Sequence, residues 1–164
     1  MVQAGAPGFL AWLAGTSLST TMRTATWAYP VVEIVHIAGF SVLVGSVVLF
    51  DLRVLGCARA LPVAELGRHL LRWALMSALL VVPAGLLLFI AHPVELANNP
   101  AFLLKLGLIA AAGVNALLFH LLPYRTVASW DRERPAPAAA RFGAALSILL
   151  WLGVISCGRL LAYL

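Results

Sequence analysis

Residues 29–50, YPVVEIVHIAGFSVLVGSVVLF, decide the fold of this chain. At about 1.5 Å of rise per residue, a helix of this length crosses the roughly 30 Å hydrocarbon core of a bilayer. Lipid offers no hydrogen-bond partners to the backbone, so a segment that crosses it must be helical. The stretch therefore predicts a transmembrane helix. Glu33 and His36 inside it become candidate functional groups, because ionisable side chains are rare and expensive in hydrocarbon.

The composition of the whole chain extends this conclusion. Of its 164 residues, 63% are hydrophobic and 10% are charged, and the mean hydropathy is +1.01. A soluble domain is about half apolar and about a quarter charged. Three further apolar runs are long enough to span a bilayer: 73–91, 102–122 and 142–161. We expect an all-α integral membrane four-helix bundle, with residues 1–164 forming a single transmembrane domain.

The segment before the first span, residues 7–22, combines apolar residues with a run of Ser and Thr. Pro7 suits the first position of a helix. The basic n-region that a cleaved signal peptide would carry is missing. We expect a short N-terminal helix lying in the membrane interface; the alternative is a loosely ordered arm.

Basic residues gather in the loop between the first two spans and in the loop between the last two. Eight of the eleven Lys and Arg residues lie there: Arg53, Arg59, Arg68, Arg72, Arg125, Arg132, Arg134 and Arg141. The positive-inside rule makes that face cytoplasmic. We expect a multi-pass protein of the bacterial inner membrane with both termini periplasmic. Topology and contact with lipid headgroups account for the net charge of +5, so we expect no nucleic-acid partner.

The four histidines form two pairs in this topology, with His36 and His92 near the outer face and His69 and His120 near the inner face. Imidazole is the commonest nitrogen ligand of haem iron and copper. The depths within each pair differ. At about 1.5 Å per residue, His69 lies roughly 10 Å further toward the cytoplasm than His120, and His36 lies roughly 6 to 12 Å deeper than His92. An inner centre requires the second helix to continue through His69 and to turn it toward His120.

The charged neighbours of these histidines leave alternatives open. Glu33 lies one turn from His36. It is either the ion-pair partner of Lys105 or Arg159, or a protonatable group at a quinol site beside His36. Arg72 is either a haem-propionate ligand or an ordinary topology arginine.

One set of residues follows a recognisable pattern. It comprises Trp27-Ala28-Tyr29-Pro30, Glu33, His36, Gly39, Asp51-Leu52-Arg53, Leu55-Gly56, Lys105, Asn115 and His120. The pattern resembles an uncharacterised bacterial family of small four-span membrane proteins, which implies no established activity. More loosely, the chain is similar to cytochrome-b-like di-haem and copper-resistance membrane proteins. The likeness to the cytochromes implies that His36 with His92, and His69 with His120, ligate haem b, although the fourth span has no histidine.

The leading functional expectation is a membrane-bound b-type cytochrome that transfers electrons between quinol and a periplasmic redox protein through one or two haem b groups. Such a protein can serve as the electron-transfer subunit of an oxidoreductase. One alternative is copper handling at the outer histidines. The other is a non-redox structural subunit of a larger membrane complex. Hydrolytic chemistry has no support, because the sequence contains none of the usual nucleophile, zinc-protease or phosphate-loop motifs.

Overall fold

The computed structural model describes residues 8–132, 134–161 and 163. Four of its helices are long and apolar enough to cross a membrane: α3 (Ala28–Leu55), α4 (Val63–Ala91), α6 (Pro100–Leu121) and α7 (Ala138–Leu160). The described part of the chain contains no strand. The expected all-α architecture with four membrane-compatible helices is therefore confirmed.

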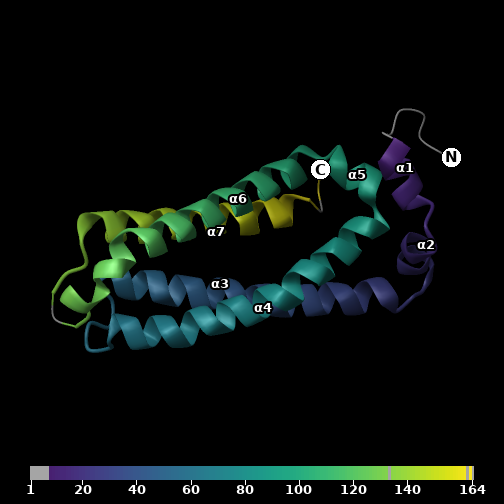
Figure 1. The fold of residues 1–164 in the computed structure, drawn as a ribbon. Coiled ribbons are helices and arrows are strands. Elements are labelled where there is room, and N and C mark those ends of the chain that lie inside the picture. Colours follow the sequence, from purple (N-terminus) through teal and green to yellow (C-terminus); the bar gives the residue numbers. More distant parts are fainter. Residues whose placement is uncertain (1–7, 133, 162, 164) are drawn as a thin grey trace.

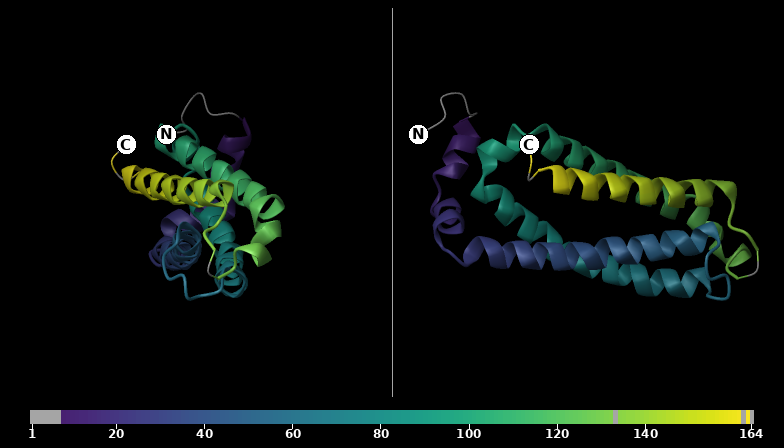
Figure 2. Two further views of the ribbon diagram at one scale, coloured as in Figure 1. Left: turned by 90° about the vertical axis from the view of Figure 1, so that its left-hand side faces the viewer. Right: turned by 180° about the vertical axis from the view of Figure 1, so that it is seen from behind.

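The long helices form two hairpins, α3 with α4 and α6 with α7, stacked as two layers (Figures 1 and 2). The α3–α4 and α6–α7 connections lie together at one end of the molecule, here called the loop end. The start of α1 (Gly8–Ala14) and the end of α7 lie at the other, here called the terminal end. The sequence places the eight loop arginines at the loop end. α3 and α7 join the layers, whereas the backbones of α4 and α6 do not approach each other.

Helix α4 begins ten residues earlier than the apolar run that predicts it, at Val63 instead of residue 73. Hydropathy detects only the part of a helix that lies in hydrocarbon. Residues 63–72 are mixed polar and apolar, but they contain good helix formers such as Ala, Leu, Glu and Arg. The helix therefore continues past the apolar run.

Small residues let α3 and α4 pack closely. A Cβ at Gly39 would lie 2.8 Å from the Val81 side chain, and one at Gly85 would lie 3.0 Å from the His36 ring. Such contacts are typical of membrane bundles, where close backbone approach replaces the hydrophobic effect as the source of helix association.

The loop end holds the larger apolar core. Its buried residues are Phe50, Val54, Val63, Phe119, Trp130, Ala140 and Ala144. Arg53 is also buried here and donates to the Leu61 carbonyl at 2.6 Å and the Asp131 carbonyl at 3.1 Å. The Asp131 carboxylate in turn accepts from the Ala64 amide at 2.8 Å, which caps the start of α4. The connection that contains η1 (Pro123–Ser129) is thereby tied to the α3–α4 hairpin.

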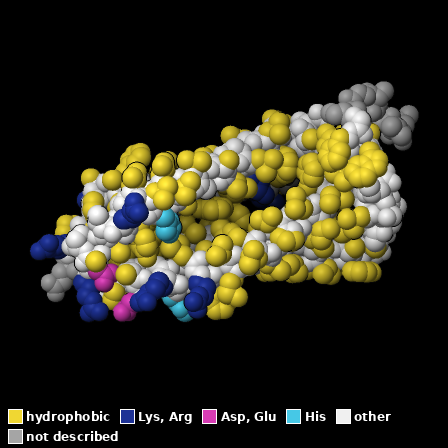
Figure 3. Space-filling view, in the orientation of Figure 1, with side chains coloured by type: hydrophobic (Ala, Val, Ile, Leu, Met, Phe, Trp, Pro, Cys, Tyr) yellow, Lys and Arg dark blue, Asp and Glu magenta, His cyan; other side chains and the backbone are white. Residues whose placement is uncertain are grey.

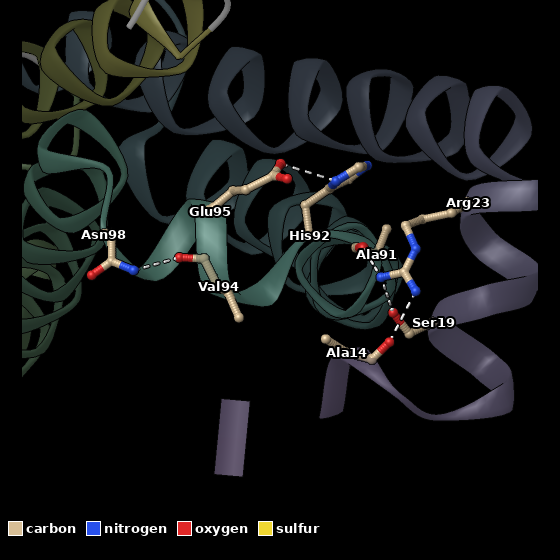
Figure 4. Close-up of polar contacts among 8 residues, drawn as sticks. All are labelled: Ala14, Ser19, Arg23, Ala91, His92, Val94, Glu95 and Asn98. Atoms are coloured by element: carbon tan, nitrogen blue, oxygen red, sulfur yellow. Dashed lines mark hydrogen bonds and ion pairs between the residues drawn. The ribbon is translucent and has the colours of Figure 1, made fainter. Parts of the chain in front are cut away.

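The terminal end is covered by three short helices, α1 (Gly8–Ala14), α2 (Ser17–Thr24) and α5 (Pro93–Ala97). Arg23 donates to the carbonyls of Ala14 and Ala91, at 2.9 and 3.2 Å, and so fastens α1 and α2 to the end of α4 (Figure 4). The described part of the predicted N-terminal segment therefore forms two helices, while Pro7 lies outside the described residues. The exposed rings of Phe9 and Trp12 suit an interfacial position.

Candidate functional site

The His36 ring is held by the backbone of the neighbouring helix. Its Nδ1 lies 3.0 Å from the Val81 carbonyl oxygen of α4. A carbonyl only accepts, so Nδ1 carries the proton and donates it, and the Nε2 lone pair is left free. A backbone carbonyl on one ring nitrogen is the usual arrangement behind a metal-ligating histidine, because it fixes both the tautomer and the ring orientation.

Aromatic packing holds the same ring from the other side. Phe40, one turn along α3, stacks on His36 with ring centroids 6.3 Å apart, and Trp151 of α7 meets Phe40 edge-on at 5.9 Å. Gly85 faces the imidazole and leaves the space that the ring occupies. Three helices therefore determine the position of one half-buried histidine.

A hollow opens between the two layers. Figure 3 shows it between α4 and α6, with apolar side chains around it and a basic side chain inside. Lys105 of α6 is half-buried, and its Nζ lies against Gly158 of α7, 3.7 Å from where a Cβ would be. Its charge is within electrostatic reach of His36. Among the described residues Lys105 has no hydrogen-bond or ion-pair partner.

Glu33 does not form the ion pair that the sequence left open. Its side chain is exposed, one turn from His36, and it contacts neither Lys105 nor Arg159 within the described part of the chain. Arg159 is instead hydrogen-bonded to the Tyr163 hydroxyl. Its guanidinium also lies over the Tyr163 ring, 4.8 Å from the centroid. The assignment of Glu33 to a quinol site stays a prediction.

The outer histidines lie in different surroundings. His92 ends α4, where its Nδ1 is 3.1 Å from Glu95 Oε2, and its ring meets Tyr29 edge-on at 5.9 Å (Figure 4 shows the His92–Glu95 contact). Tyr29 precedes His36 by seven residues, which is about 10 Å of helix rise. The structure therefore puts His92 closer to the terminal end than His36. Their joint ligation of haem stays a prediction.

The inner histidines also lie apart. His120 packs on Tyr124, with ring centroids 5.2 Å apart, and the residue of α4 that reaches Tyr124 is Gly67. His69 follows Gly67 by two residues, about 200° around the helix, and is exposed. α4 does continue through His69, as an inner centre requires, but it turns this residue away from His120. Arg72 is exposed on the same helix, and its role as a propionate ligand stays untested.

Two buried polar residues, Asp51 and Arg53, were given no functional role from the sequence. Arg53 is 5% exposed and holds the loop end together. Asp51, also 5% exposed, meets the Ser147 hydroxyl of α7, and its Oδ2 has no partner. The sequence did contain one indication of this: Phe40, Val47 and Asp51 follow each other at helical spacing along residues 40–51, which places Asp51 on a packed face of that helix.

Comparison of the chain with protein-family models, curated proteins and solved structures finds no match. Within the described residues there is also no group of three or more His, Cys, Asp or Glu side chains that could hold a metal ion. The fold and the site together define a multi-pass membrane protein of four long apolar helices. Inside α3, the His36 imidazole is held by the Val81 carbonyl of α4 and stacks on Phe40.

Proposed function

We propose that this chain is a membrane-bound haem b protein that transfers electrons between quinol and a periplasmic redox partner, and that His36 would hold the haem iron. One observation supports this function above all: the Nδ1 proton of His36 is donated to the Val81 carbonyl, which leaves Nε2 as a free, oriented donor to iron. Haem supplies one-electron exchange at the iron, and the axial ligand helps to set its potential.

The surroundings of His36 fit a haem in three respects. The backbones of α4 and α6 stay apart and leave a hollow between these helices (Figure 3), and we assign the macrocycle to that space. Phe40 and Trp151 supply aromatic rings beside the imidazole, against which a macrocycle could pack. Lys105 offers an ammonium group without a partner among the described residues, which is the group that a propionate would take.

One centre has more support than two. The inner pair would need His69 to face His120, and α4 directs it elsewhere. Copper handling has no separate supporting observation. A structural subunit does have one, because the open side between α4 and α6 is also where another membrane subunit could pack.

Purified protein tests the proposal by its absorption spectrum, first oxidised and then reduced with dithionite. We expect a b-type spectrum that is lost in His36→Ala and kept in His69→Ala, since His69 is exposed and points away from the hollow. A ratio of about one haem per chain, unchanged in His120→Ala, would assign the single centre to His36. Glu33→Gln should keep the haem and shift its midpoint potential, because the Glu33 charge is within electrostatic reach of the imidazole.

Full haem content in His36→Ala would contradict the assignment. Folded protein without any haem would end the cytochrome proposal and favour the structural subunit. A thermal unfolding measurement of each variant separates loss of the ligand from loss of the fold.

A further inference from the structure

A small cavity at the loop end is lined by four guanidinium groups. It measures about 60 Å³ and lies where α3 ends and the segment leading into α7 begins. Its arginines are Arg53, Arg59, Arg134 and Arg141, and no described residue that lines it is acidic. Figure 3 shows the Lys and Arg side chains of this face gathered at the loop end. The cavity is far from His36, so it is independent of the proposed haem site.

The Arg53 guanidinium, which lines the cavity, is held in place by hydrogen bonds. The buried Arg53 guanidinium donates to the carbonyls of Leu61, Arg59 and Asp131, at 2.6, 3.2 and 3.1 Å. Carbonyl oxygens satisfy its N–H groups without neutralising its charge, and the Asp131 carboxylate, which does not line the cavity, acts on Arg53 from a distance. Arg53 therefore brings one permanent positive charge to the wall of the cavity.

Arg59 is held close to that charge. Its guanidinium lies over Gly56, where an added Cβ would come within 3.3 Å of Nη2, and it is within electrostatic reach of Arg53. Two guanidinium groups held near each other repel. An anion bound between them is attracted to both, and this attraction outweighs the repulsion. Gly56, with φ of 115°, adopts the left-handed conformation that lets the chain make this turn.

The first turn of α7 adds to the positive field. Its N-cap position is Pro137, which provides no side-chain cap for the first amide groups, and Arg141 projects from this turn. The start of a helix carries a partial positive charge that favours anions nearby. The start of α7 adds to the positive potential of the arginine cavity, but it would not bind an anion without the arginines.

We propose that this cavity binds the phosphate group of an anionic phospholipid. Arginine matches phosphate oxygens in pairs, and basic pockets at the cytoplasmic ends of membrane helices are suited to such headgroups. A lipid is favoured over free phosphate because exposed apolar residues of α3 and α7 are next to cavity arginines in the chain: Leu52 precedes Arg53, and Phe142 follows Arg141. Leu49 and Leu52 of α3 and Phe142 of α7 are 58%, 37% and 70% exposed, and they offer a track for acyl chains beside the arginines.

Native mass spectrometry of the detergent-purified protein tests the proposal, with phosphatidylglycerol and phosphatidylcholine as probes. The variant Arg59→Gln/Arg141→Gln removes two charges that line the cavity. The control Arg72→Gln/Arg125→Gln removes two charges from the same face, at exposed positions outside it. We expect phosphatidylglycerol to bind the unmodified protein in preference to phosphatidylcholine. Binding should weaken about tenfold or more in the cavity variant and less than about twofold in the control.

Equal losses in the two variants would overturn the proposal, because the binding would then report diffuse surface charge. Inorganic phosphate provides the second arm. If phosphate displaces the lipid only at concentrations far above that of the lipid, the lipid source is supported. If phosphate binds alone with the same sensitivity to the cavity variant, while phosphatidylglycerol does not bind, the lipid is the wrong source and the proposal fails. Arg59 and Arg141 are exposed, so the variants are expected to fold, and circular dichroism checks this.

Discussion

Each polar residue inside the bundle meets its hydrogen-bonding demand in a different way. Ser77 donates to the Trp73 carbonyl of its own helix at 2.8 Å, and the Asn115 amide reaches the Gly143 carbonyl of α7 at 3.0 Å. Arg53 uses carbonyls of two loops. Lys105 and Asp51 differ from these residues: Lys105 has no partner within the described part of the chain, and neither does the buried Oδ2 of Asp51. A buried unsatisfied polar group costs about 1–3 kcal/mol, so Asp51 does not owe its place to stability.

The hydrogen bonds from Arg53 to the carbonyls of two loops lead to a prediction. Arg53→Ala removes a charged donor from the carbonyls of Leu61 and Asp131 and leaves them buried without their partner. We expect the free energy of unfolding to fall by about 2–3 kcal/mol, the usual range for hydrogen bonds to charged groups. Arg59→Ala is the matched control, because the side chain of Arg59 is exposed and the backbone carbonyl that Arg53 uses is kept.

Denaturant titration of both variants in the same detergent provides the measurement. Equal stabilities for Arg53→Ala and Arg59→Ala would show that the carbonyl contacts of Arg53 do not hold the two loops together.

At the scale of the helices, the α3–α4 pair depends on close approach at a few small residues. Gly39 faces Val81, and Gly85 faces His36, so the contact that packs the helices also fixes the imidazole. Gly45 lies on the same helix α3 and has nothing within 4 Å of its Cβ position. Glycine composition alone does not distinguish these roles.

Gly39→Ala and Gly45→Ala should therefore have effects of opposite sign. Alanine is the better helix former by about 0.5–1 kcal/mol, so Gly45→Ala should leave the stability unchanged or raise it. At Gly39 the new methyl group would lie 2.8 Å from the Val81 side chain, and overpacking of this kind costs about 1–3 kcal/mol. Thermal unfolding followed by circular dichroism compares the two variants, and a stabilised Gly39→Ala protein would mean that α3 and α4 are not closely packed there.

At the scale of the whole molecule, the two hairpins are fastened most firmly at the loop end. The larger core, the Arg53 contacts and the cap at Ala64 all lie there. The layers separate toward the terminal end, where Arg23 ties α1 and α2 to the end of α4. The same loop end carries most of the basic residues. Arg53 contributes both to the packing of this end and to its positive charge.

Reporter fusions test the orientation of this arrangement. The positive-inside rule places the α3–α4 and α6–α7 connections in the cytoplasm. Green fluorescent protein fused after Ala60 or after Ala138 should fluoresce, and alkaline phosphatase fused there should be inactive. A fusion after the exposed Asn98, at the terminal end, is the control and should give the reverse pattern. Phosphatase activity at both loop positions would invert the molecule and exchange its inner and outer histidines.

The sequence by itself determined the class of the protein and its main elements. Apolar runs of membrane-spanning length require helices because lipid cannot satisfy the backbone, and this requirement holds whatever the helices pack against. The sequence also indicated an N-terminal segment at the interface and the clustering of arginines in two connections, and it singled out His36 with Glu33. Hydropathy did not predict the extension of α4 through His69, because it detects only the part of a helix that lies in hydrocarbon.

Only the tertiary structure decided which side chains meet. The rotation of α4 brings Gly67 and not His69 to Tyr124, and its approach to α3 supplies the Val81 carbonyl that orients His36. Rotation and approach depend on interlocking side chains from several helices at once, which no single apolar run encodes. The same holds for the arginine cavity, since Arg59 and Arg141 are far apart in sequence and meet only because α3 ends where the segment leading into α7 begins.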